Sequence, residues 1–318
     1  MKILTNAVAN FEFLSKYNSF EKLNGFCKDY MLDGFEIICA GEIPSCIKNR
    51  LTVGFHLPFY NQWIDFYRMD TAILTENFKS RDIWENFYGG KDFSCVEQNL
   101  KNQLDTANSL GAEYVVLHVS EVSAKETLTG VFSHSDKEVI TNMCSIINRL
   151  FKGENYSFKL LLENLWWPGF TFTDPALTEY MLSSIEYPHK GIMLDTGHLL
   201  QTAGGICGWE EGEKYINKII DKNRHLLKYV YGVHLHGGLK KDFVKPQAEN
   251  SDDFYTQFAK AYSYVQNTDR HLPFETEKIQ NIIEKISPNW LVYEFAGNTL
   301  EEKIPLIGKQ NFYMGRCK

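Results

Sequence analysis

Short runs of apolar and β-branched residues alternate with longer amphipathic segments along most of the chain. Eight runs have the length and composition of buried strands: residues 2–8, 34–39, 52–59, 114–120, 159–164, 190–195, 229–237 and 290–295. Between them, apolar residues at helical spacing predict helices, including 96–109, 136–151 and 276–286. Near-continuous apolar strands separated by helices are typical of a parallel sheet covered on both faces.

Eight such units in one chain of 318 residues favour a (β/α)8 barrel, the TIM-barrel architecture. A doubly wound open sheet is the alternative, but no GxGxxG motif follows an early strand, which weakens it. The sequence contains no internal repeat, low-complexity segment or Pro/Ser-rich linker. We therefore expect residues 1–318 to form a single domain, with residues 238–268 as a long insertion or cap after the seventh strand.

Composition narrows the class of protein. No apolar run is long enough to cross a bilayer, and the first residues lack the pattern of a signal peptide, so we expect a cytoplasmic protein without a membrane partner. The seven cysteines are scattered and never spaced as CxxC, which fits reduced thiols. The net charge of −7 argues against nucleic acid as the partner. A small-molecule substrate is the expected partner.

Six of the predicted strands end in residue types that bind metals. Alternation along the strands places Glu163 on the same face as Leu161, and Asp195 on the same face as Met193. In a barrel these strand ends converge on the C-terminal face, where active sites lie. His198 follows Asp195 by three residues and can reach back over the same opening. The strand-end residues are His56, His118, Glu163, Asp195, His234 with His236, and Glu294.

Each of these residues taken alone has an ordinary explanation, such as a hydrogen-bonded core histidine. Their recurrence at one strand end after another is not explained in this way. Several buried carboxylates and imidazoles without partners would be costly, and divalent ions would compensate that cost. The residue types are compatible with zinc, manganese, iron or cobalt, and we expect one to three ions.

Seven short segments in this order resemble the xylose isomerase-like barrels, the superfamily that includes endonuclease IV and sugar isomerases and epimerases. They are HLPF at His56, VVLHVS at His118, LLEN at Glu163, LDTGH at Asp195 and His198, VHLHG at His234, DRHLPF at Asp269 and His271, and VYEF at Glu294. The resemblance covers most of the chain. It implies the barrel fold and metal-dependent chemistry.

The two branches of this superfamily imply different metal sites. The endonuclease IV branch implies three metals held by His56, His118, Glu163, Asp195, His198, His234, Asp269, His271 and Glu294. The epimerase branch implies one metal at Glu163, Asp195, a histidine of the HLH pair and Glu294. Whether His234 or His236 is the ligand stays open. Residues 238–268 form a longer connection than this resemblance predicts, which weakens the assignment of Asp269 and His271.

Ligand count favours phosphoester hydrolysis at two or three ions, because an epimerase needs only part of this set. The alternative is a sugar or sugar-phosphate isomerase or epimerase, in which Glu163 and Glu294 move a proton between adjacent carbons. His198 is the third candidate catalytic residue. HLP, ENL, LDTGHLL and VHLHG are also similar to segments of cobamide-remodelling phosphodiesterases. A barrel that binds metal without turnover is a further possibility.

Two aromatic loops, residues 59–68 and 165–172, are expected beside the opening of the barrel. They either pack over the rim or stack on a substrate. A phosphate could contact Arg68 or the lysines at positions 240, 241 and 245, although such charges are more often only solvated. The candidate substrate-binding residues are therefore Tyr60, Trp63, Arg68, Trp166, Trp167 and Lys240.

Overall fold

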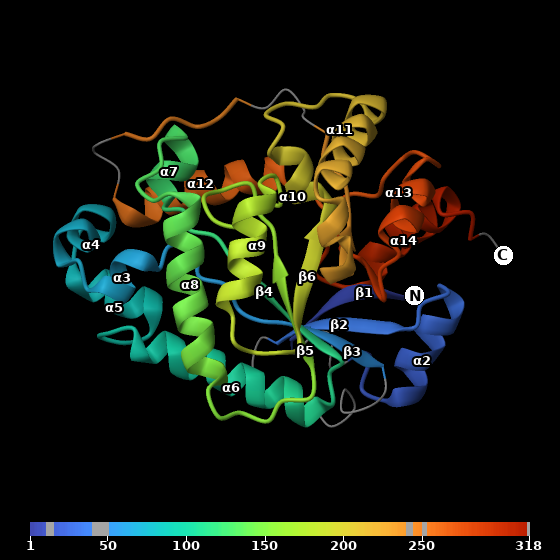
Figure 1. Ribbon diagram of the computed structural model, residues 1–318, viewed down its shortest axis with the longest axis horizontal. Coiled ribbons are helices and arrows are strands. Elements are labelled where there is room, and N and C mark those ends of the chain that lie inside the picture. The colour runs from blue at the N-terminus through green and yellow to red at the C-terminus, as the bar shows by residue number, and fades with distance from the viewer. Residues whose placement is uncertain (11–15, 40–50, 240–243, 250–252, 317–318) are drawn as a thin grey trace.

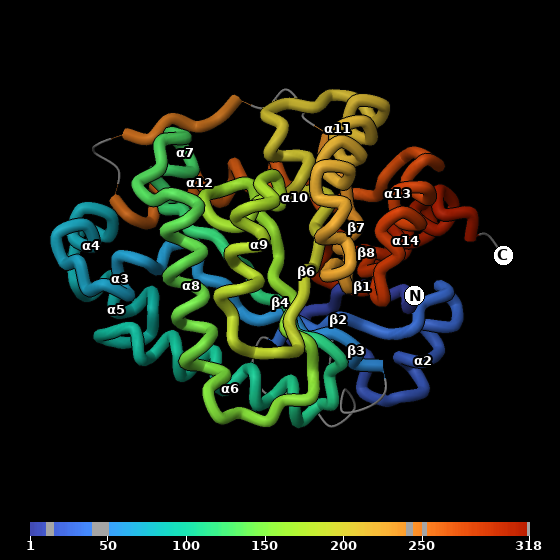
Figure 2. Tube along the Cα trace, viewed as in Figure 1, coloured from blue at the N-terminus to red at the C-terminus, as the bar shows by residue number. Residues whose placement is uncertain are grey.

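The protein is a closed barrel of eight parallel strands in a computed structural model, which describes residues 1–10, 16–39, 51–239, 244–249 and 253–316. Each strand pairs with the next one in the chain, and β1 pairs with β8, which closes the barrel. The tube in Figure 2 shows β7, β8 and β1 side by side. The strands are β1 (Lys2–Ala9), β2 (Gly34–Cys39), β3 (Thr52–His56), β4 (Tyr114–His118), β5 (Lys159–Glu163), β6 (Lys190–Asp195), β7 (Val230–Leu235) and β8 (Trp290–Tyr293).

Helices surround the strands (Figure 1). The predicted barrel is thereby confirmed, and so is the predicted helix 136–151, which begins after the capping side chain of Ser135. The helices are α2 (Phe20–Asp29), α3 (Ile64–Arg68), α4 (Thr71–Phe78), α5 (Arg81–Tyr88), α6 (Ser94–Leu110), α7 (Ala124–Thr129), α8 (Asp136–Phe151), α9 (Pro175–Ser184), α10 (Thr196–Gln201), α11 (Trp209–Lys222), α12 (Phe254–Thr268), α13 (Ile279–Ile286) and α14 (Leu300–Tyr313), with a 3-10 turn at Arg224–Tyr229.

The interior of the barrel is a small apolar core of its own. Leu161, Met193 and Val292 all belong to it and are fully buried. Each lies two residues before a carboxylate at or next to the end of the same strand, so alternation points those carboxylates inward as the sequence predicts. Burying each such apolar side chain contributes about 1.5–3 kcal/mol. The packed interior therefore forms a rigid floor beneath the strand ends.

The connection between β7 and β8 contains a helix that packs outside the strands. Its helix α12 packs against α7, which follows β4, and Figure 1 shows the two helices together beyond the strands. Phe254 at the start of α12 lies against Phe78 and Phe87, with ring centroids 4.6 and 5.6 Å apart. This aromatic cluster anchors α12 over α4 and α5.

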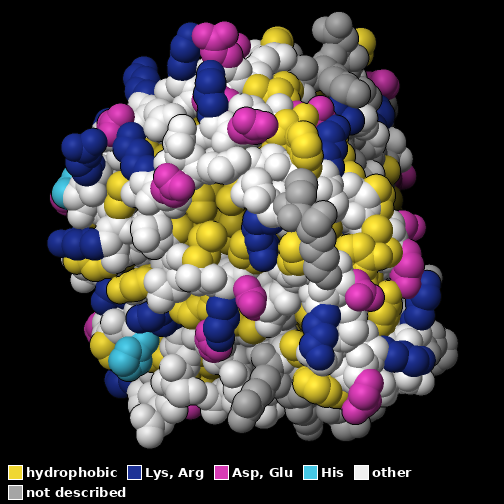
Figure 3. Space-filling model, turned by 90° about the vertical axis from the view of Figure 1, so that its right-hand side faces the viewer, with side chains coloured by type: hydrophobic (Ala, Val, Ile, Leu, Met, Phe, Trp, Pro, Cys, Tyr) yellow, Lys and Arg dark blue, Asp and Glu magenta, His cyan; other side chains and the backbone are white. Residues whose placement is uncertain are grey.

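The surface is mixed in charge where Figure 3 displays it. On that face lysine and arginine side chains are interspersed with acidic ones, and hydrophobic side chains gather near its middle. Among the residues described, no helix has both the length and the apolar character needed to cross a membrane.

Candidate metal centre

Strand register brings the predicted ligands together. His118 at the end of β4 is the ladder partner of Glu163 at the end of β5, and Asp195 at the end of β6 is the partner of His234 on β7. Glu294 follows β8 by one residue, because that strand ends at Tyr293. All ten candidate ligands fall into three neighbouring donor groups, which we call the central, the His56 and the Asp269 group.

The central group consists of Glu163, Asp195, His234 and Glu294, all buried. The Nδ1 atom of His234 lies 3.2 Å from a carboxylate oxygen of Glu294, 3.4 Å from one of Glu163 and 3.8 Å from one of Asp195. Four donors about 2.1 Å from a tetrahedral ion lie about 3.4 Å apart. The spacing of the central group therefore fits a divalent ion.

The His56 group consists of His56, His118 and Glu163. Both imidazoles direct Nε2 at the same oxygen, Oε2 of Glu163, at 3.2 Å each. The other oxygen of Glu163, Oε1, faces His234 in the central group. Glu163 therefore spans two donor groups with one carboxylate.

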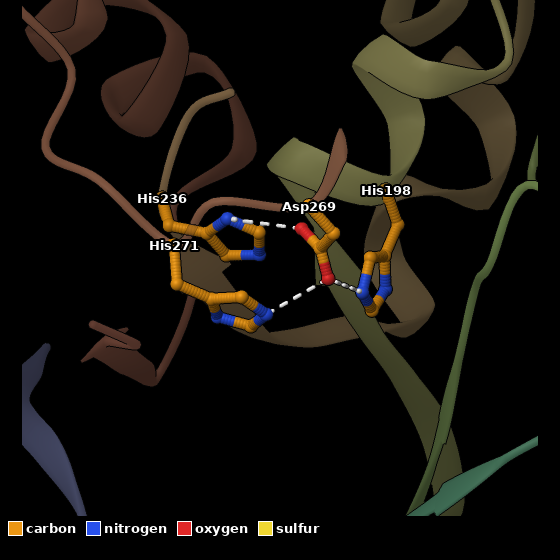
Figure 4. A group of neighbouring side chains, drawn as sticks. All are labelled: His198, His236, Asp269 and His271. Atoms are coloured by element: carbon orange, nitrogen blue, oxygen red, sulfur yellow. Dashed lines mark hydrogen bonds and ion pairs between the residues drawn. The ribbon is translucent and has the colours of Figure 1, made fainter. Parts of the chain in front are cut away.

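The Asp269 group consists of His198, His236, Asp269 and His271 (Figure 4). The Asp269 carboxylate lies between three imidazoles, with Oδ2 at 3.2 Å from His198 Nε2 and 2.8 Å from His271 Nε2. The rings of His236 and His271 are stacked 4.0 Å apart. His234 and His236, between which the sequence leaves the choice open, thus belong to different donor groups.

Buried polar atoms without a hydrogen-bond partner accumulate in these groups. An unpartnered buried acceptor or donor costs about 1–3 kcal/mol, so a cluster of them calls for an occupant. Divalent cations bound in these groups would accept the lone pairs of the atoms that face them, so the residues fit the metal that the resemblance implies. The atoms are Glu163 Oε1, Glu294 Oε2, Asp269 Oδ1, and the Nδ1 atoms of His118, His234 and His236.

The electrostatics of the site are those of tightly packed opposite charges. Burial lowers the pKa of His234, but Glu294 and two neighbouring glutamates raise it by more, to well above its ordinary value. Burial likewise lowers the pKa of His271, and Asp269 and Glu294 raise it to about 9. His118 differs, because burial dominates and lowers its pKa. Some of these imidazoles are protonated when no ion is bound, and a bound ion would replace their protons.

Ring nitrogens of three of these histidines have fixed partners outside the three donor groups or in the backbone. His56 Nδ1 is 2.8 Å from the carbonyl of Leu57, and His198 Nδ1 is 2.9 Å from the carbonyl of Asn164. The Nε2 atom of His234 is 3.1 Å from the carboxylate of Glu36 on β2. Such partners select the tautomer that directs the remaining nitrogen at an ion.

Glu36 and Gly197 are two residues of the site that the sequence did not predict. Glu36 lies within an apolar strand rather than at its end, and only its burial beside His234 and the Tyr114 hydroxyl reveals its role. Gly197 leaves room for His236, because a Cβ atom there would lie 2.0 Å from the imidazole Cε1. The sequence did contain a signal for Gly197, since it stands between the candidate ligands Asp195 and His198 in the LDTGH segment.

A fourth donor group shares no residue with the other three. It consists of Asp65, Glu121 and His134, none of which stands out in the sequence as a candidate ligand. Glu121 accepts hydrogen bonds from the backbone NH groups of Trp63 and Ile64, and burial and Asp65 raise its pKa well above the ordinary value. His134 pairs with Asp65 and Glu138. These contacts explain the fourth donor group as a buried hydrogen-bond and ion-pair network at the start of α3, without a bound ion.

A cavity of about 610 Å³ opens above the donors and is lined by residues of the His56 and Asp269 groups. Tyr60, Trp166 and Trp167 line it as well. Two predicted substrate contacts do not reach the cavity: Trp63 is buried in the core, where its indole NH donates to the Ser120 carbonyl, and Arg68 pairs with Glu138. Lys240 lies outside the described residues.

Fold and donors together define a metal-binding TIM barrel. The family model described as "Xylose isomerase-like TIM barrel" matches residues 50–303, so the chain belongs to that family. This family includes sugar isomerases and epimerases and AP endonucleases. No curated protein matches the chain.

Similar solved structures share the fold at low sequence identity. The crystal structure of AsfvAP:AG is 11% identical, with a TM-score of 0.57, over 100% of this chain and 99% of that one. A D-tagatose 3-epimerase-like protein is 16% identical, with a TM-score of 0.53, over 99% and 97% of the two chains. An L-ribulose 3-epimerase is 11% identical, with a TM-score of 0.52, over 99% and 93%.

Proposed function

We propose that the protein is a divalent-metal-dependent phosphoesterase that hydrolyses a small-molecule substrate at two or three ions. One observation carries the proposal: three donor groups with ion-compatible spacing adjoin one another, and two of them share Glu163. A carboxylate that offers one oxygen to each of two groups is the arrangement expected for neighbouring ions. Zinc, manganese, iron and cobalt all accept this mixture of imidazole and carboxylate.

Two or three ions held in this way would stabilise both the attacking and the leaving oxygen of an in-line displacement. In the hydrolysis, the oxygen of water forms a bond to phosphorus, the bond from phosphorus to the leaving oxygen breaks, and that oxygen takes up a proton. The chain's part is to hold the donors rigidly and to bind the ester. Asn164 and Leu57 would keep His198 and His56 in the tautomer that the ions require.

Isomerisation or epimerisation of a sugar is the second candidate. Its support is that the central group alone is the set that the epimerase resemblance assigns to a single ion, with Glu163 and Glu294 available to move a proton between carbons. Two similar structures also carry the name of an epimerase. The names favour this candidate and the donor count favours hydrolysis. We give the donors more weight, because identities of 11–16% establish the fold alone.

The decisive experiment compares both reactions on one metal-reconstituted preparation. We expect release of p-nitrophenol from bis(p-nitrophenyl) phosphate, and no deuterium exchange at the carbon next to the carbonyl in a panel of ketoses. Glu163→Gln should abolish hydrolysis while circular dichroism and thermal unfolding stay close to those of the parent protein. Deuterium exchange without hydrolysis would establish the epimerase instead. The absence of both reactions would support a barrel without turnover.

A further inference from the structure

The cavity above the donors continues into a chamber with mostly apolar walls. We define the chamber by six residues on three segments: Trp166 and Trp167 after β5, Val122 before α7, and Phe258, Tyr262 and Val265 on α12. Resting on the proposed function, we propose that the substrate is a phosphoester with a bulky apolar group, which the chamber binds while the donors hold the phosphate end.

Size is the first argument. The cavity measures about 610 Å³ and is continuous with His118, His198 and Asp269 of the metal centre. Pockets of about 300–1,000 Å³ bind ligands of drug size. An ester no larger than its phosphate and a short polar chain would leave most of this space to water.

The chemistry of the walls is the second argument. Each hydroxyl of a buried sugar needs a hydrogen-bond partner, because an unsatisfied polar group costs about 1–3 kcal/mol. The tryptophan rings and the aliphatic side chains of Val122 and Val265 offer few such partners. Flat or apolar groups need none and gain about 25 cal/mol for each Å² removed from water.

Open aromatic faces are the third argument. Phe258 and Tyr262 lie one helical turn apart with nearly parallel rings, and they remain 41% and 57% exposed although they line the cavity. Close to the metal centre, Phe59 is 52% exposed and stacks on His118, with ring centroids 4.6 Å apart. Contiguous exposed apolar side chains are a feature of ligand-binding grooves.

Helix α12 holds the chamber side chains in place from one end. Phe254, one turn before Phe258, is buried against Phe78 and Phe87, so the helix is fixed independently of any ligand. Tyr255 lies on the same helix, is 61% exposed and is not part of the cavity lining. It therefore provides a matched control for changes in the chamber.

The test is equilibrium binding of two phosphate esters to the zinc-loaded protein by isothermal titration calorimetry, which needs no turnover. We expect 1-naphthyl phosphate to bind at least tenfold more tightly than glycerol 1-phosphate. The double variant Phe258→Ala with Tyr262→Ala should lose this preference while its affinity for glycerol 1-phosphate stays unchanged. Tyr255→Ala should alter neither affinity.

A filling variant gives a second, independent measurement. Val265→Trp should occupy the chamber and weaken binding of 1-naphthyl phosphate at least tenfold, with little effect on glycerol 1-phosphate. Equal affinities of the parent protein for the two esters would refute the proposed role of the chamber. A parallel loss of affinity for both esters in the variants would refute it as well. Preferential binding without hydrolysis of any phosphoester would leave the chamber intact and refute only the proposed function.

Discussion

Replacing Gly197 by alanine should remove one ion-binding group while leaving the barrel folded. The added methyl carbon would lie 2.0 Å from Cε1 and 2.3 Å from Nδ1 of His236. Ordinary contact begins near 3.4 Å, so the ring would have to retreat by about 1.4 Å, the difference between 3.4 and 2.0 Å. Metal ligands tolerate displacements of only about 0.2 Å.

The ring of His236 is fully buried, so its displacement would disturb its other contacts. His236 is held by a 2.8 Å contact from Nε2 to the Asp195 carboxylate and is stacked on His271. We expect the affinity of the Asp269 group for its ion to fall at least about 10–100-fold. Overpacking should also lower the free energy of unfolding by about 1–3 kcal/mol.

The assay is metal content after dialysis, measured by plasma mass spectrometry, together with competition against a chromophoric chelator. Gly25→Ala in α2 is the matched control, because a Cβ atom there meets nothing within 4 Å. This control should keep every ion and gain up to about 1 kcal/mol of stability. Combining Gly197→Ala with His236→Ala should restore most of the stability that Gly197→Ala loses, since the clash is then gone. Full metal content in Gly197→Ala would refute the assignment of His236 to an ion.

Glu36→Gln should lower the affinity of the central group for its ion about 10–100-fold, because the Glu36 carboxylate orients His234. Tyr114→Phe, which removes a hydrogen bond to the same carboxylate, is its control. Equal affinities of Glu36→Gln and the parent protein in chelator competition would contradict the role of Glu36. Lys303→Met should remove a pH dependence of stability. Burial lowers the pKa of Lys303 from 10.5 to about 8, so the native state loses this proton first and the free energy of unfolding rises by about 1.4 kcal/mol per pH unit above about pH 8. Urea unfolding of both proteins between pH 7 and 10 measures the difference, and parallel pH profiles would contradict the prediction. His198→Ala should lower metal content by one ion; unchanged content would place His198 outside the ion-binding set.

The barrel could be predicted because its strands repeat one simple pattern. Every predicted strand exists, and the runs 34–39 and 190–195 have the observed bounds. Helix 276–286 begins three residues later than predicted, at Ile279, where no side chain caps it. A start without a capping side chain leaves little signal in the sequence.

The convergence of the candidate ligands was predictable because strand ends converge in any parallel barrel. For Asp269 and His271 the structure adds their position beside His198, through the end of α12 and a left-handed backbone at His271, with φ of 47°. Trp63 and Arg68 could not be separated from Tyr60 by sequence, because a five-residue helix between β3 and α4 turns them away from the cavity. Glu36 became visible only through its contact across the barrel with His234.

The number of ions bound per chain tests the central claim most directly. It is measured by plasma mass spectrometry after anaerobic purification and reconstitution, on the parent protein and on His134→Ala, which removes the fourth donor group from the count. We predict two or three ions per chain that persist in His134→Ala. A single ion per chain, bound by the central group alone, would contradict the account and favour the epimerase.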